Sequence, residues 1–161
     1  MPEFTHLEDE GGIHMVDVSR KPSSTRSASA EGVIQLGVDA YTALTQKRIA
    51  KGDVLTTAQL AGIMGAKDTA RLIPLCHPIP LDSVVLSFSF DEKMYAVKIQ
   101  AEVTSCGRTG VEMEALTAVS IASLSIYDMC KSISKAIRIT DIRLISKDGG
   151  VHGRYSVDST P

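Results

Sequence analysis

Hydrophobic and polar positions alternate with a period of two in several segments of the chain, which is typical of strands that bury one face. The pattern covers residues 30–36, 83–90 (SVVLSFSF), 95–104 (YAVKIQAEVT) and 136–146 (AIRITDIRLIS). The four polar or flexible residues 91–94 between the second and third segments predict a hairpin. These two strands are therefore expected to pair antiparallel.

Helical spacing of apolar residues marks three other segments. Residues 39–49 form the first, and Gly52 breaks its pattern. Thr56 and Thr57 are predicted to cap a second helix over 57–73, and a long third helix is predicted over 111–134. Pro74, Pro78 and Pro80 bracket the stretch between the second helix and the next strand, which predicts a rigid, extended turn there.

The long helix is apolar on nearly every face, so we expect it to be buried on every side. A small sheet can cover one side of such a helix. We therefore predict that the opposite side meets another subunit and that the protein forms a homo-oligomer.

The order β-α-α-β-β-α-β predicts an α+β sandwich in which helices pack on one face of a mostly antiparallel sheet. Residues 1–30 are rich in Ser, Thr, Gly and charge and are predicted to form a mobile N-terminal arm. Residues 31–161 are predicted to form a single domain, which suits a chain of 161 residues.

Composition narrows the classes of partner. The formal net charge is −2 and aromatic residues make up 4% of the chain, which argues against nucleic-acid binding. Charged residues interrupt the apolar stretch 111–133, which argues against a membrane span. The acidic first residues resemble no targeting segment, and the three cysteines are widely spaced, so we expect reduced thiols and a cytoplasmic location.

The proline-bracketed sequence Leu75-Cys76-His77 is the first candidate for chemistry. A histidine on a restricted backbone can meet a ligand at a fixed geometry. The alternative is a turn histidine that caps a helix end. The spacing of cysteine and histidine lacks the pattern of a zinc site, so no metal is predicted.

Asp128 and Lys131 form the second candidate, because side chains at i and i+3 share a helix face. A solvated surface pair is the ordinary interpretation. Their neighbours are apolar, however, and a desolvated lysine with a lowered pKa beside an aspartate would suit general acid–base catalysis.

Glu112 and Glu114, at the start of the same helix, either interact with its N-terminal dipole or contact a ligand. Glu114 and Asp128 share a face but stand about 21 Å apart at the helical rise per residue. A compact site in one chain cannot readily include both. Either the site lies between subunits or the two carboxylates have different roles.

Basic residues form the last candidate group. Lys51 lies in a break between helices, and Arg20, Lys21 and Arg26 lie in the arm, with Lys147 near the tail. They could close on an anionic ligand or simply aid solubility. The chain has no glycine-rich phosphate-binding fingerprint, so phosphates would have to be held by side chains.

Together these segments closely resemble the molybdenum cofactor biosynthesis protein C (MoaC) family. The resemblance covers nearly the whole chain and rests on Met15-Val-Asp-Val-Ser, Lys51-Gly-Asp, Leu75-Cys-His-Pro, Thr109-Gly-Val-Glu-Met-Glu-Ala-Leu-Thr and Tyr127-Asp-Met-Cys-Lys. It implies a ferredoxin-like fold and a hexamer built as a trimer of dimers, with the site at a dimer interface.

The resemblance also implies a lyase that converts 3′,8-cyclo-7,8-dihydro-GTP into cyclic pyranopterin monophosphate and releases pyrophosphate. Asp128, Lys51 and Lys131 match the family's catalytic residues. The substrate-binding residues that it implies are Leu75, Cys76, His77, Met113 and Glu114, with Glu112, Asp17, Arg26 and Lys147 as weaker candidates.

No cofactor is predicted, and a need for Mg²⁺ is not readable from the sequence. Two other classes of protein remain as alternatives. One is a non-catalytic module that binds purine nucleotides or orders an oligomer. The other is a metal-binding module built on Cys76 and His77.

Overall fold

The computed structural model describes residues 12–150 and 153–157. Its elements, in chain order, are β1 (Ser24–Gln35), α1 (Val38–Thr45), α2 (Val54–Lys67), α3 (Thr69–Leu72), β2 (Ser83–Asp91), β3 (Ala96–Gly107), α4 (Glu112–Cys130), β4 (Arg138–Asp148) and β5 (Tyr155–Ser156). The strands form one sheet in the order β2-β3-β1-β4-β5.

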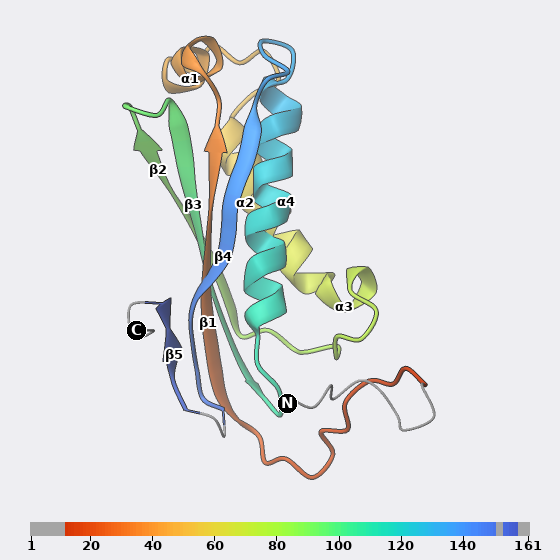
Figure 1. The fold of residues 1–161 in the computed structure, drawn as a ribbon. Helices are drawn as coiled ribbons and strands as arrows, with labels where there is room; N and C mark the ends of the chain where they lie inside the picture. The colour runs from red at the N-terminus through yellow and green to blue at the C-terminus, as the bar shows by residue number, and fades with distance from the viewer. Residues whose placement is uncertain (1–11, 151–152, 158–161) are drawn as a thin grey trace.

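All neighbouring strands pair antiparallel, and α2 and α4 pack on one face of the sheet (Figure 1). The predicted α+β fold, with helices on one face of an antiparallel sheet, is confirmed. The predicted hairpin is also confirmed, because β2 and β3 pair along their whole length from Ser83 and Thr104 to Asp91 and Ala96.

The central strand β1 carries small side chains on the face that meets α4. Ala28 and Ala30 are buried there, and a Cβ atom at Gly32 would lie 2.7 Å from Val119 Cγ1. Small residues let α4 lie close against the sheet. Beside Gly32, β4 bulges and Asp141 takes a φ of 55°.

The helix α4 contacts the sheet on one side and α2 on another, which corrects one step of the sequence argument. A Cβ atom at Gly62 of α2 would lie 2.9 Å from the carbonyl oxygen of Ala118, so the two helices touch through their backbones. The second side of α4 is thus covered within the same chain. The expected burial on every side is not reached within one chain, because Leu124 of α4 is 55% exposed. That another subunit covers this face stays a prediction.

Several element boundaries differ from the predicted ones. Strand β1 begins at Ser24, paired with Gly107 of β3, so the expected boundary at residue 30 falls inside a strand. The arm prediction for residues 1–11 lies outside the described residues. Helix α4 ends at Cys130, four residues before the predicted end, and β5 was not predicted.

The second predicted helix is divided, and its cap was wrongly assigned. Helix α2 starts at Val54 because the Asp53 carboxylate accepts a hydrogen bond from the Thr56 backbone N–H, 3.0 Å away. Asp68 then separates α2 from the short α3. The proline-bracketed stretch that follows is neither helix nor strand, as predicted. In the described parts of the chain, no helix is long and apolar enough to cross a membrane.

Candidate functional site

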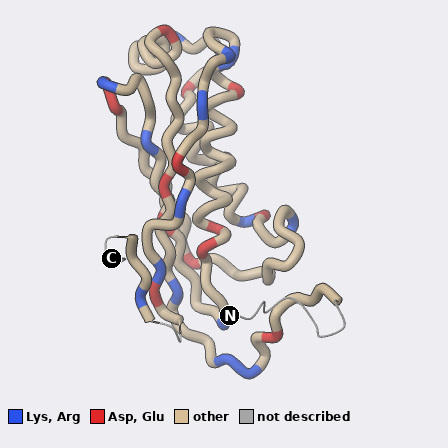
Figure 2. Tube along the Cα trace, viewed as in Figure 1, with Lys and Arg blue, Asp and Glu red and all other residues tan. Residues whose placement is uncertain are grey.

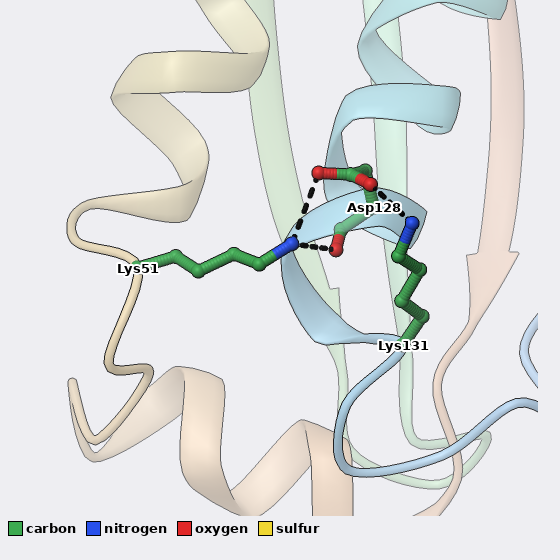
Figure 3. Close-up of polar contacts among 3 residues, drawn as sticks. All are labelled: Lys51, Asp128 and Lys131. Atoms are coloured by element: carbon green, nitrogen blue, oxygen red, sulfur yellow. Dashed lines mark hydrogen bonds and ion pairs between the residues drawn. The ribbon is translucent and has the colours of Figure 1, made fainter.

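The predicted catalytic residues meet at the C-terminal end of α4 (Figure 3). Asp128 lies in the last turn of the helix, and Lys131 follows directly after it. Lys51 approaches from the loop between α1 and α2, where Gly52 has a φ of 107° and Asp53 caps α2. The loop geometry and the helix cap thus direct a lysine distant in sequence toward the end of α4.

The Asp128 carboxylate lies between two ammonium groups. Lys131 Nζ is 2.6 Å from Oδ1, and Lys51 Nζ is 3.1 Å from Oδ2. Lys51 also donates a hydrogen bond to the Asp128 backbone carbonyl oxygen, at 2.6 Å. The bond to the backbone carbonyl holds Lys51 against the last turn of α4 independently of the Asp128 carboxylate.

This cluster is more exposed than the sequence suggested. The side chains of Lys51, Asp128 and Lys131 are 44%, 59% and 51% exposed. Hydrogen bonds from Lys131 and Lys51 lower the pKa of Asp128, and the Asp128 carboxylate raises the pKa of Lys131. The expectation of a desolvated lysine with a lowered pKa is therefore wrong for this chain, and the ordinary interpretation, a solvated surface pair, describes Asp128 and Lys131.

A second group of predicted residues lies at the other end of α4. Leu75, Cys76, His77, Met113 and Glu114 line a cavity of about 380 Å³, together with Glu112, Val16 and other residues. Glu112 and Glu114 are in the first turn of the helix. The structure therefore brings together the two segments that the sequence analysis assigned to substrate binding.

The histidine in this cavity has a fixed orientation. His77 Nε2 donates a hydrogen bond to the backbone carbonyl oxygen of Val16, at 2.8 Å. That bond places the proton of the neutral ring on Nε2 and leaves Nδ1 as an acceptor. The alternative role as a helix cap does not describe this histidine, because its partner belongs to a non-helical part of the chain.

Glu114 is the buried acid of the site. Its residue is only 3% exposed, and burial raises the pKa of its carboxyl group. Burial also raises the pKa of the Cys76 thiol, with a further contribution from the charge of Glu114. The Glu114 carboxyl and the Cys76 thiol are therefore both shifted toward their protonated forms.

A second, smaller cavity of about 130 Å³ adjoins the first and shares Lys21 and Glu112 with it. Arg26, Arg108 and Lys147 also line it. Figure 2 shows basic residues gathered at this end of the molecule, on the arm and at the ends of β1 and β4. An anionic group would be attracted to such a pocket.

Arg26 is only 9% exposed, which is unusual for an arginine. Its Nε and one terminal nitrogen donate to the carbonyl oxygens of Gly107 and Arg108, both at 3.4 Å. Neutral carbonyls do not cancel the charge. Lys147, by contrast, forms an ion pair of 2.8 Å with Glu112.

Comparison with known proteins agrees with this arrangement. The MoaC family model matches residues 15–150, which include both ends of α4 and every residue that lines the larger cavity. This chain belongs to the MoaC family.

Similar proteins within the family share about half of their residues with it. A protein from Salinibacter ruber called cyclic pyranopterin monophosphate synthase is 52% identical over 98% of this chain and 95% of its own length. A protein of the same name from Cereibacter sphaeroides is 50% identical over 99% of this chain and its full length. Molybdenum cofactor biosynthesis protein 1 of Drosophila melanogaster is 53% identical over 92% of this chain, which covers 26% of that longer protein.

One residue carried over from the MoaC family lies apart from the others. The Asp17 carboxylate accepts a hydrogen bond from the Ser19 backbone N–H at 2.8 Å, which lowers its pKa, and Asp17 lines neither cavity. The structure also adds Arg108 and Thr109 to the cavity walls. The sequence offered one sign that Thr109 belongs to the site: it lies just before a helix that begins with two glutamates.

In the part of the chain that the structure describes, no group of three or more His, Cys, Asp or Glu side chains is placed to hold a metal ion. Cys76 and His77 are neighbours in sequence, and the charge of the buried Glu114 acts on the Cys76 thiol.

Proposed function

We propose that this protein is a cyclic pyranopterin monophosphate synthase, a lyase of molybdenum cofactor biosynthesis. The observation that carries the proposal is the identity of 50–52% with proteins of that name over nearly the full length of this chain. Its substrate would be 3′,8-cyclo-7,8-dihydro-GTP, and its products cyclic pyranopterin monophosphate and pyrophosphate. We place the reaction in the cytoplasm and assign it no cofactor.

The cluster at the C-terminal end of α4 supports a role in proton transfer. Asp128, with its lowered pKa, is ionised at neutral pH, and Lys131, with its raised pKa, is charged, so the two groups stand in the starting states of a base and an acid. Both shifts lie away from the working pH, so efficient proton transfer would require the substrate to part the pair and bring both pKa values back toward that pH. Rearrangement of the purine-derived ring requires several proton transfers. Lys51, held by the Asp128 backbone, would stabilise negative charge that develops beside the pair.

The cavities at the other end support binding of the substrate. The pocket lined by Arg26, Lys21 and Lys147 suits the triphosphate, and the adjoining cavity with His77 and Glu114 suits the ring system. A carboxyl group with a raised pKa and the Nδ1 acceptor of His77 can together match the donors and acceptors of a purine-like edge.

The distance between the two clusters supports a site shared between subunits. Helix α4 has 19 residues, so its ends are about 28 Å apart at the helical rise per residue. Catalytic residues at one end cannot reach a substrate held at the other end of the same helix. We therefore propose a dimer in which each site takes one end of α4 from each subunit, assembled into a hexamer with ferredoxin-like protomers.

The activity is tested by incubating the purified protein with the cyclised dihydro-GTP intermediate. We expect release of pyrophosphate together with a pterin that becomes fluorescent on oxidation. Asp128→Ala and Lys51→Ala should remove both signals, whereas the matched Asp68→Asn should not, because Asp68 pairs with Arg71 at the same i,i+3 spacing but lies in neither cluster. Nucleotide binding without product would favour the non-catalytic module instead.

The shared site is tested by mixing two inactive variants, Asp128→Ala and Glu114→Ala, under conditions that exchange subunits. With random mixing of equal amounts, about a quarter of the sites would regain both intact ends, and activity should return to that fraction. Activity that stays at zero in verified mixed oligomers would show that each site belongs to a single chain.

A further inference from the structure

The segment that carries His77 lacks the regular hydrogen bonds of a helix or strand, so its position depends on a few anchors. Pro74, Pro78 and Pro80 have no backbone N–H to donate. The Ser105 hydroxyl donates a hydrogen bond of 2.7 Å to the carbonyl oxygen of Pro80, and the Asp82 N–H donates one of 3.0 Å to Thr104. Both anchors come from β3.

Ser105 is unusual among the polar residues of β3, because it is fully buried on the face toward the helices. It lies directly opposite Arg26 in the pairing of β1 with β3. Ser105 therefore links two parts of the site: its backbone pairs with Arg26 of β1, and its side chain holds the segment that carries His77.

We propose that Ser105 is a positioning residue that sets the location of Leu75, Cys76 and His77 in the cavity; this inference rests on the proposed function. Each proline holds its φ near −65°, so the chain between Pro78 and Pro80 bends little. Fixing the Pro80 carbonyl therefore fixes the direction from which His77 enters the cavity. The bond from His77 to Val16 then holds the ring itself.

Removal of the hydroxyl should disturb the segment more than the fold. Ser105→Ala leaves the carbonyl of the exposed residue Pro80 without its protein donor, so water can take that place and the segment is released from β3. Small misplacements of binding groups have large kinetic effects, so we expect kcat/KM to fall about tenfold. Ser123→Ala is the matched control, because Ser123 is equally buried and donates to Val119 within α4, away from both cavities.

The first test is a double-mutant cycle with His77→Ala. If Ser105 acts through the histidine segment, Ser105→Ala should lower kcat/KM in the parent but change it little further in His77→Ala. Equal losses in both backgrounds would overturn the proposal, since they would indicate a general structural role. Ser105→Thr, which keeps the hydroxyl, should retain most of the parental kcat/KM.

The second test does not depend on catalysis. Cys76 lies in the same segment, so its rate of reaction with a thiol reagent reports on the segment's mobility. In a Cys106→Ser background, which removes the exposed thiol, Ser105→Ala should raise the rate of Cys76 several-fold and Ser123→Ala should not. An unchanged rate would refute the proposal even in an active enzyme.

The two tests separate the possible failures. A protein that makes no product but shows the faster Cys76 reaction would refute the proposed function and leave the anchor in place. If Ser105→Ala does not fold, Ser105→Cys serves as the second variant, because a thiol has similar size but is a weak donor. It should lower kcat/KM in the same direction, and parental kinetics would overturn the proposal.

Discussion

The two ends of α4 present acids in opposite states. At the N-terminal end, Glu114 is buried and its pKa is raised. At the C-terminal end, Asp128 is exposed to solvent, contacts two lysines and has a lowered pKa. The same helix therefore carries a carboxyl group that resists ionisation and another that ionises readily.

The helix dipole alone would produce the reverse. It favours negative charge at the N-terminus and disfavours it at the C-terminus. Burial overrides the dipole at Glu114, and the ammonium groups of Lys51 and Lys131 override it at Asp128. The immediate surroundings of each carboxyl group therefore decide its protonation, so the two ends of one helix differ in the acids they carry.

The largest effect is expected from Asp128→Asn, which keeps the shape of the side chain and removes its charge. Because acid–base groups contribute about 10²–10⁴-fold to rates, kcat should fall by that factor while the oligomer stays intact. Pyrophosphate release measures the change, and Asp68→Asn is the control. Near-normal turnover in Asp128→Asn would end the assignment of proton transfer to this end of the helix.

Gly62→Ala tests the close packing of α2 against α4 and β2. Alanine normally stabilises a helix relative to glycine. Here a Cβ atom would lie 2.5 Å from Leu86 Cδ2 and 2.9 Å from the Ala118 carbonyl oxygen, so we expect the variant to be destabilised by about 1–3 kcal/mol. Urea unfolding measures this; a more stable variant would show that α2 and α4 can separate freely.

Glu114→Gln should change the pH dependence of stability. Because the folded pKa is raised, the folded protein holds this proton more tightly than the unfolded chain, and stability falls as pH rises from the unfolded pKa through the folded pKa. Glutamine removes that loss. The melting temperature of Glu114→Gln relative to the parent should therefore rise between pH 4 and pH 7, and a constant difference would contradict burial of an ionisable acid.

The smallest effect concerns stability at the exposed end. Because the folded pKa of Asp128 is lowered, its stabilising contribution is present above the unfolded pKa and is lost as pH falls through the folded pKa. Asp128→Asn should therefore lower the melting temperature slightly at neutral pH. The difference should shrink in acid and at high salt, since exposed pairs are screened.

A difference that persists in 1 M salt would show that Asp128 is less exposed in the assembled protein than in one chain. Lys131→Met, which removes the other charge and keeps the chain length, should respond to salt in the same way. Its contribution is present below the unfolded lysine pKa and is lost as pH rises through the raised folded pKa.

The sequence predicted the fold well where local pattern decides the structure. The alternating segments that become β2 and β3 are one example, and the extended segment between Pro74 and Pro80 is another. It failed for the start of β1, because Ser24 to Ser29 resemble a polar arm and become a strand only through pairing with β3 and β4. Asp53 was missed as a helix cap because Thr56 and Thr57 are also good capping residues.

In the candidate site, too, local spacing was predictable and contacts between distant segments were not. The i,i+3 spacing of Asp128 and Lys131 predicted their contact, and the helical rise predicted that Glu114 would lie far from Asp128. The sequence left two interpretations of this pair, solvated or desolvated, and the structure decides for the solvated one. Ser105 gave no signal, since one serine in an alternating strand is ordinary until its partner across the fold is known.

The length of α4 has a consequence for how this chain can vary. Each residue added to a helix turns everything beyond it by about 100° and moves it by about 1.5 Å. An insertion in the middle of α4 would swing Asp128 away from Lys51 while leaving Glu114 where it is. A change in the residue count of α4 would therefore alter the relative orientation of its two ends, which a substitution on its surface would leave in place.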